Sequence, residues 1–307
     1  MTKDRTAMAT EQTTANGISI TYEDKGAKDA PAILLVMGLG GQLTLWPDEF
    51  VDALVAHGFR VIRYDNRDVG LSTRFDAAGV PNLKWMFVKA ALKLPVRSAY
   101  TLADMAADGM ALLDHLGIDR AHVVGASMGG MIAQHIAARY PGRVLSLTSV
   151  MSTTGNPRLP RAQKEAMRVL ANRPMSGDPE AMIAYSVNAA RVIGSPDYPA
   201  EEARLQRRVR NDYERGWYPQ GVARQMAAIV ADGDRREMLK GVRAPTLVIH
   251  GEADPLVPIA GGRDTAASIP GARLLTIPGM GHDLPLALVD TLADAIAEHA
   301  KGVAVAA

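Results

Sequence analysis

Short apolar, β-branched runs alternate with amphipathic helical segments along most of this 307-residue chain. The alternation predicts parallel βαβ units, because strands that are buried on both faces need helices to cover the sheet. Amphipathic helices are expected at 101–116, where apolar side chains recur at helical spacing, and from about 287 to 299. The chain is therefore predicted to be an α/β protein with a mostly parallel sheet flanked by helices. The strands are expected at 17–24, 32–37, 60–65, 121–126, 144–150, 244–250 and 273–278.

The alternation is interrupted once, between about residues 151 and 240, where the sequence becomes helix-like and heavily charged. Strand patterns continue on both sides, so we interpret 151–240 as a helical cap inserted into one core formed by 1–150 and 241–307. A second segment, 81–100, is apolar with basic residues interleaved. We expect it to be an additional lid segment over a pocket mouth, although an interfacial membrane helix has the same pattern.

Composition excludes several kinds of chemistry. The chain has no cysteine, which excludes disulfides, thiolate metal sites and a cysteine nucleophile. Its 34 basic and 33 acidic residues give no electrostatic footprint for nucleic acid. The N-terminal residues lack the apolar core of a secretory signal, and no apolar run reaches 18 residues. We expect a cytoplasmic protein with no stable membrane insertion, no metal and no cofactor.

Residues 125–129, Gly-Ala-Ser-Met-Gly, match the G-x-S-x-G pattern. The pattern is short, but here it follows an apolar strand and precedes a helix, as a nucleophile elbow requires. Small flanking residues suit so tight a turn, and the helix N-terminus adds partial positive charge beneath a developing oxyanion. Ser127 is therefore the candidate nucleophile.

A serine hydroxyl needs a base and an orienting acid. Asp254 follows the strand at 244–250, and His282 follows the next one, so both are expected at the carboxyl edge of the sheet. Glu252 and Asp283 are the competing acids, but their positions make the geometry awkward. The remaining histidines lie in helical, strand-end or surface contexts, which favour structural roles: His57, His115, His122, His135, His250 and His299.

The tetrahedral intermediate of acyl transfer needs hydrogen-bond donors for its oxyanion. The elbow supplies the backbone N–H of Met128. A glycine-rich loop after the strand at 32–37 offers the N–H of Leu39 or, in a shifted register, of Gly40. That loop lacks the spacing of the nucleotide-binding motifs, so phosphate binding is disfavoured.

The chain resembles the α/β-hydrolase superfamily over roughly 17–150 and 241–300, and within it the aclacinomycin methylesterase group of bacterial ester hydrolases. The resemblance implies Ser127, His282 and Asp254 as catalytic triad, with Leu39 and Met128 as oxyanion donors. Many relatives have His-Gly in the oxyanion loop where this chain has Met37-Gly38, and the 81–100 segment is longer than in the methylesterase. The resemblance lies in separate blocks, LLVMGLGG, VIRYDNRDVGLST, HVVGASMGG, LVIHGEADPLVP and IPGMGHDLP.

These residues predict hydrolysis of a small, apolar carboxylic ester through an acyl-enzyme. Cleavage of a C–C bond, a lactone or a thioester, cofactor-free perhydrolysis and a slow-turnover ligand receptor remain open on the same triad, and so does a homodimer. An apolar pocket for a bulky or long acyl group is expected. Its expected lining residues are Gly38, Gly40, Trp85, Phe87, Trp217 and Tyr218.

Overall fold

The computed structural model describes residues 10–172, 174 and 177–304. These residues form an eight-stranded sheet in the order β1-β2-β4-β3-β5-β6-β7-β8. β2 runs antiparallel to both of its neighbours, and all other pairs are parallel. The strands are β1 Glu11–Ala15, β2 Ile18–Lys25, β3 Ala32–Val36, β4 Arg60–Tyr64, β5 Ala121–Ala126, β6 Val144–Val150, β7 Thr246–Gly251 and β8 Arg273–Ile277.

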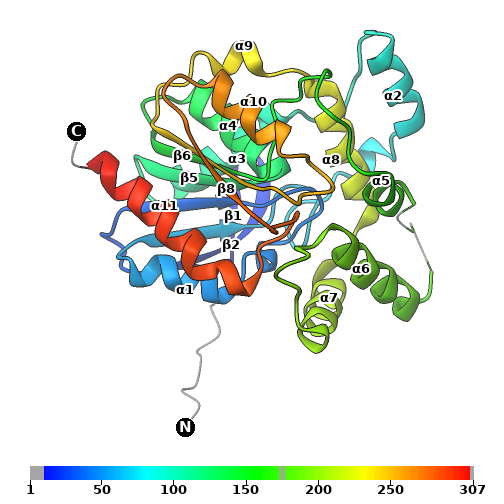
Figure 1. Cartoon of the computed structure of the whole chain (residues 1–307), viewed down its shortest axis with the longest axis horizontal. Coiled ribbons are helices and arrows are strands. Elements are labelled where there is room, and N and C mark those ends of the chain that lie inside the picture. The colour runs from blue at the N-terminus through cyan, green and yellow to red at the C-terminus, as the bar shows by residue number, and fades with distance from the viewer. Residues whose placement is uncertain (1–9, 173, 175–176, 305–307) are drawn as a thin grey trace.

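Helices cover both faces of the sheet (Figure 1). β3 shows the effect, because all five of its residues are buried and alternate side chains enter two separate cores. Leu34 and Val36 pack on the side of α3 and α4, while Ile33 and Leu35 pack on the side of α1 and α11. The covering helices are α1 Asp48–Ala56, α3 Leu102–His115, α4 Met128–Arg139, α10 Ala260–Ser268 and α11 Val289–Ala304.

The residues between β6 and β7 are here called the β6–β7 insertion, and its described part contains helices but no strand. α6 and α7 share a small apolar core of their own, formed by Ile183, Val187, Leu205 and Val209. α8 instead packs against α3, and α9 against α4 and α10, so the end of the insertion is joined to the flank of the sheet. Its helices are α5 Lys164–Ala171, α6 Pro179–Ile193, α7 Glu202–Gly216, α8 Pro219–Asp232 and α9 Arg236–Leu239.

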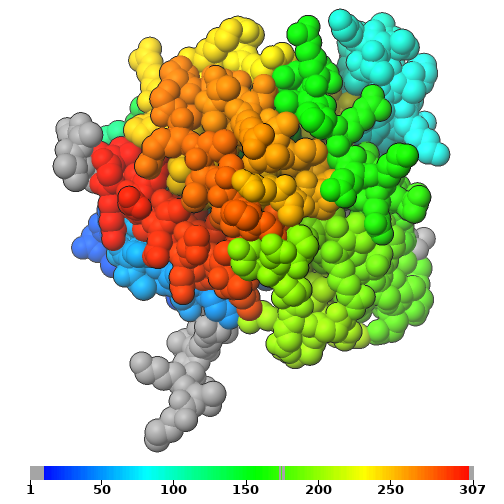
Figure 2. Space-filling model, viewed as in Figure 1, coloured from blue at the N-terminus to red at the C-terminus, as the bar shows by residue number. Residues whose placement is uncertain are grey.

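The 81–100 segment contains one helix, α2 Leu83–Ala91, which projects from the edge of the molecule. It packs against α8 through a single buried side chain of the helix, Met86. Figure 2 shows the α2 region as a cyan prominence beside the insertion.

The predicted fold class is confirmed, and each expected strand is present with ends shifted by a few residues. Sequence analysis missed β1, which is polar and largely exposed. Its signal is the Asn16-Gly17 pair, whose positive φ angles of 50° and 74° make the tight turn into β2. Within the described ranges no helix is both long and apolar enough to cross a bilayer. Residues 1–9, on which the expectation of no secretory signal partly depends, lie outside those ranges.

Candidate active site

Ser127 lies at the sharp turn between β5 and α4. Its φ of 56° and ψ of −120° are a strained conformation for a residue with a side chain. The turn is held by two hydrogen bonds to the Ser127 backbone: the Ser127 N–H donates to the Val150 carbonyl at 2.9 Å, and the Ser152 side-chain hydroxyl donates to the Ser127 carbonyl at 2.7 Å. The hydroxyl is thereby fixed at the carboxyl edge of the sheet and at the N-terminus of α4.

The glycines on either side of Ser127 make this turn sterically feasible. A Cβ on Gly125 would lie 2.1 Å from the Gly129 carbonyl oxygen, and one on Gly129 would lie 2.0 Å from the Val36 carbonyl oxygen. Both distances are far below van der Waals contact, and the atoms met are backbone atoms that cannot rotate away. The glycines of the motif are therefore required by the packing of β5, α4 and β3.

The structure brings Ser127, His282 and Asp254 together in a hydrogen-bonded line. His282 Nε2 lies 2.9 Å from Ser127 Oγ, and its Nδ1 lies 2.7 Å from Asp254 Oδ2. The other oxygen of Asp254 accepts the N–H groups of Leu256 and Val257 at 2.9 and 2.8 Å. With its carboxylate held this way, Asp254 fixes the imidazole orientation and favours the tautomer with hydrogen on Nδ1.

The competing acids have other surroundings. Glu252 is exposed, and Asp283 accepts a hydrogen bond from Ser195 Oγ at 2.5 Å. Burial raises the pKa of Asp283.

The other histidines form their hydrogen bonds elsewhere, although His250 Nε2 also lies 3.6 Å from Asp254 Oδ2. His250 donates to the Val257 carbonyl at 2.7 Å and so supports the loop of Asp254; burial lowers its pKa. The remaining partners are Asp294 for His57, Thr13 for His115, Ser146 for His122, Asp232 for His135, and the Leu147 and Pro245 carbonyls for His299.

The glycine-rich loop after β3 borders Ser127, since a Cβ on Gly38 would lie 3.0 Å from the Ser127 Cβ. Gln225 of α8 anchors this loop. Its Oε1 accepts the Gly40 N–H at 2.8 Å, and its Nε2 donates to the Arg67 carbonyl at 2.8 Å. Gln225 is completely buried. A residue of the β6–β7 insertion thus sets the loop position, and sequence analysis did not identify it.

The insertion also supports the histidine loop. The His282 N–H donates to the Ile193 carbonyl at 2.7 Å, and the Gly281 N–H donates to Ser195 Oγ at 2.8 Å. A Cβ on Gly281 would lie 2.4 Å from the Gly194 carbonyl oxygen. The end of α6 and the residues after it therefore form the seat of the histidine loop, a role that no local sequence pattern indicates.

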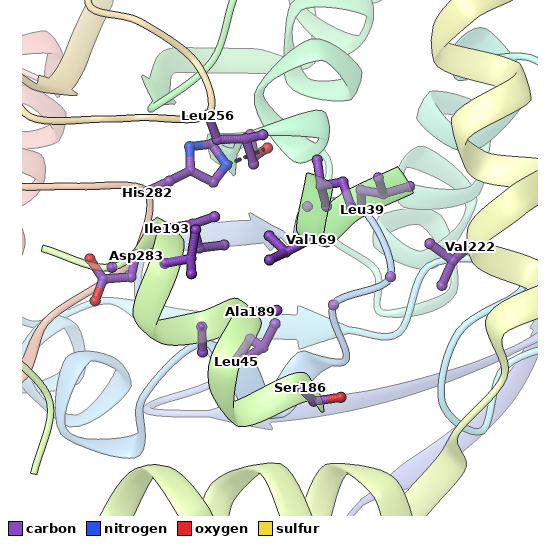
Figure 3. A pocket seen from close by; sticks show the side chains of 18 of the residues that line it. Leu39, Leu45, Val169, Ser186, Ala189, Ile193, Val222, Leu256, His282 and Asp283 are labelled. Atoms are coloured by element: carbon purple, nitrogen blue, oxygen red, sulfur yellow. Dashed lines mark hydrogen bonds between the residues drawn. The ribbon is translucent and has the colours of Figure 1, made fainter. Parts of the chain in front are cut away.

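A cavity of about 1190 Å³ opens over Ser127 and His282, between the carboxyl edge of the sheet and the insertion. Its labelled walls in Figure 3 are mostly aliphatic, with His282 and Asp283 at one end. Of the expected lining residues, Gly38, Gly40, Trp217 and Tyr218 border this cavity, and so does Leu39, the expected oxyanion donor.

Trp85 and Phe87 do not line the cavity, contrary to expectation. Their exposed fractions are 53% and 48%, because α2 turns Met86 toward the protein and these two neighbours toward solvent. From this segment Leu83 borders the cavity instead. The expectation that Trp85 and Phe87 line the pocket was therefore wrong, and the role of 81–100 as a lid segment stays a prediction.

Sequence comparisons agree with this architecture. Residues 31–286 match the α/β hydrolase fold family. The rhodomycin D methylesterase DnrP of Streptomyces peucetius is 32% identical, over 97% of this chain and 100% of that protein. The bifunctional esterase/perhydrolase DCH of Acinetobacter calcoaceticus is 27% identical, over 91% of this chain and 95% of that protein.

A solved structure gives the same fold. The esterase RhEst1 from Rhodococcus sp. ECU1013 superposes with a TM-score of 0.74 at 21% identity, covering 97% of this chain and 99% of that one. The family match extends over most of the sequence, from β3 to the loop beyond His282, and includes the elbow and both partner loops. The chain belongs to the α/β hydrolase family.

Proposed function

We propose that Ser127 is the nucleophile, His282 the general base and Asp254 the orienting acid in the hydrolysis of carboxylic esters. The chain is an ester hydrolase, as its similarity to methylesterases and esterases indicates. The observation that carries the assignment of roles is the continuous line from Ser127 Oγ through both imidazole nitrogens to Asp254, with contacts of 2.9 and 2.7 Å.

The reaction follows from that line. His282 Nε2 accepts the proton of the Ser127 hydroxyl as Oγ attacks the ester carbonyl, and Asp254 stabilises the imidazolium that forms. The imidazolium then protonates the leaving alkoxide, which departs as an alcohol and leaves an acyl group on Ser127. Water, deprotonated by His282, attacks the acyl-enzyme and releases the acid.

Two backbone N–H groups would stabilise the oxyanion, those of Met128 and Leu39. Gly40, the alternative donor, is engaged with Gln225, which supports Leu39. Leu39 follows Gly38, which is packed against Ser127, so the Leu39 N–H adjoins the reacting centre. The absence of the family's histidine at Met37 does not remove the donor, because the donor is a backbone group.

We further propose that the substrate is the methyl ester of a bulky, largely apolar acid. The cavity volume of about 1190 Å³ exceeds what a short acyl chain fills. A relative named as a methylesterase supports a small leaving alcohol. On this view the β6–β7 insertion acts as the cap, with 81–100 at its edge.

Ser127→Ala tests the catalytic assignment. We expect turnover of a p-nitrophenyl ester to fall by at least about 10⁴-fold, because the acyl-enzyme cannot form. Ser268→Ala is the matched control, since it removes a helical hydroxyl outside the cavity. A Ser127→Ala protein that retains wild-type turnover would show that another group is the nucleophile.

Two further proposals concern the protein as a whole, a cytoplasmic location and a homodimer. Cell fractionation tests the first and light scattering on a size-exclusion column tests the second.

A further inference from the structure

The segment 80–97, here called the α2 surface, carries an unusual concentration of exposed apolar side chains. Among the described residues, ten large apolar side chains are prominently exposed, and six of these belong to this short stretch. Scattered exposed apolar residues are ordinary, but a contiguous group indicates an interaction site. The six, with their exposed fractions, are Val80 56%, Trp85 53%, Phe87 48%, Val88 45%, Leu92 63% and Leu94 49%.

Three of these side chains, those of Trp85, Phe87 and Val88, lie on α2, which is already formed. Asn82 caps its N-terminus by accepting the Trp85 N–H at 3.0 Å. Met86 is the buried side chain of this helix, and no element of the described ranges covers the outer face that carries Trp85 and Phe87. Because the helix is ordered before binding, less conformational entropy is lost when a partner binds.

The same surface is strongly basic. No acidic residue occurs between Asp76 and Asp104, a stretch that includes all of the α2 surface, although the whole chain has a formal net charge of only +1. One of the cations, Lys89, lies 5.8 Å from the centroid of the Trp85 ring, so cations and exposed aromatic groups share one face. The basic residues of the segment are Lys84, Lys89, Lys93 and Arg97.

We propose that the α2 surface binds the face of an anionic lipid membrane. Aromatic and aliphatic side chains would enter the boundary between headgroups and acyl chains, while the lysines pair with anionic headgroups. Charge favours this partner over a second copy of the chain. A two-fold dimer through the same face would oppose four cations to four cations and bury them without counter-charge.

Docking in this orientation has a consequence for the cavity. Leu83 belongs to the same helix and borders the cavity. A membrane-bound α2 would hold that wall of the cavity at the lipid surface, where an apolar ester concentrates. Association would be peripheral and reversible, since no described helix can span a bilayer.

Co-sedimentation of the full chain with vesicles tests the proposal. We expect binding to phosphatidylcholine vesicles containing 30% phosphatidylglycerol, and much weaker binding to pure phosphatidylcholine. Binding should decline between 0.1 and 1 M salt, because the screening length falls from about 10 Å to about 3 Å. Trp85 emission should shift to the blue on binding, and the shift should disappear in Trp85→Phe, because Trp46 is already buried and Trp217 lies at the cavity and not on the α2 surface.

Substitutions on the α2 surface, compared with matched substitutions elsewhere, test whether vesicles bind to this face. Lys84→Gln with Lys93→Gln should weaken binding about fivefold per lysine removed, or about 25-fold together. Lys164→Gln with Lys301→Gln, two exposed lysines on other helices, should have no effect. Trp85→Ser should weaken binding about tenfold, while Leu274→Ser, which removes an exposed apolar side chain from β8, should not. Thermal unfolding verifies that each variant is folded.

The proposal is overturned by an absence of binding to anionic vesicles, by equal binding to both kinds of vesicle, or by binding that Trp85→Ser and the lysine variants leave unchanged. It is also overturned if the protein self-associates in solution and Trp85→Ser abolishes that association, because a second copy then covers this face. None of these outcomes bears on the catalytic role of Ser127, which is measured on a dissolved ester.

Discussion

The two walls of the cavity are built in different ways. On the sheet side, backbone collisions and backbone hydrogen bonds fix Ser127 so tightly that even one added carbon would not fit beside it. On the insertion side, α6 and α7 pack through a small apolar core of their own. Under the proposed function, this difference predicts that the chemistry depends on the loops of the sheet and that the shape of the substrate space depends on the insertion.

The roles of the two walls overlap, because residues of the insertion also hold two loops beside Ser127. Gln225 fixes the glycine-rich loop, and Ser195 with the Ile193 carbonyl fixes the histidine loop. Substitutions in the insertion should therefore fall into two groups, those that change substrate affinity and those that change turnover.

Gly129→Ala should have the largest effect and tests the rigidity of the sheet side. The new Cβ would lie 2.0 Å from the Val36 carbonyl oxygen, and neither backbone can move without disrupting β3 or α4. We expect a loss of about 3 kcal/mol or more of unfolding free energy, with activity lost as the elbow distorts. Urea denaturation measures the loss of unfolding free energy.

Gly142→Ala is the control for this substitution, since a Cβ there meets nothing within 4 Å. Its unfolding free energy should stay within about 0.5 kcal/mol of the wild type. Equal stabilities for the two variants would contradict the steric account of the elbow.

Gln225→Ala tests whether the insertion supports catalysis. Loss of the side chain frees the Gly40 N–H and the Arg67 carbonyl, so the loop that carries Leu39 is no longer held. We expect kcat to fall roughly 100-fold with a smaller change in KM, because oxyanion contacts act mainly in the transition state.

Gln206→Ala, at an exposed position on α7, should leave both constants near wild type. If Gln225→Ala instead raises KM and leaves kcat unchanged, the insertion serves substrate binding alone.

Protonation of buried histidine should destabilise the sheet side, because the 151–240 segment contains no histidine. Burial lowers the pKa of His122 on β5 from 6.5 to about 4. The folded state therefore keeps His122 neutral while the unfolded state takes up a proton below pH 6.5. This contribution to stability is present above pH 6.5 and is lost as the pH falls toward 4.

His122→Asn, which preserves a polar group facing Ser146, measures the contribution. Between pH 7.5 and 4.5 the wild type should lose about 2 kcal/mol more unfolding free energy than the variant. Parallel losses in both proteins would show that His122 is not responsible.

Trp217→Ala should have the smallest effect and tests the insertion as a wall of the substrate space. Trp217 borders the cavity beside Tyr213, so its removal should raise KM for a bulky methyl ester about tenfold and change kcat little. Trp85→Ala is the matched control on a dissolved substrate, because Trp85 lies outside the cavity. If Trp85→Ala raised KM more than Trp217→Ala does, the substrate would instead bind against α2.

The sequence predicted the sheet side in detail because its requirements are local. A strand, a G-x-S-x-G turn and a helix occupy adjacent positions, and the carboxyl ends of parallel strands necessarily meet at one edge. Asp254 and His282 could therefore be named from their places after two strands, before any geometry was known.

The insertion could not be predicted at that level, for two physical reasons. Gln225 acts on Gly40, 185 residues away, so no local pattern reports the contact. The 81–100 segment is apolar on more than one helical face, and only packing decides that Met86 is covered while Trp85 and Phe87 are not. The pattern indicated a lid segment but not the face that meets the protein.

Covalent trapping tests the central claim most directly. The wild-type protein, treated with a fluorophosphonate probe and analysed by intact-mass and peptide mass spectrometry, should gain one adduct, on Ser127. His282→Ala should react at least about 10³-fold more slowly, because the hydroxyl is no longer deprotonated. His57→Gln, which changes a histidine paired with Asp294 far from the cavity, should react at the wild-type rate. An adduct on another residue, or labelling of Ser127 that does not depend on His282, would contradict the account.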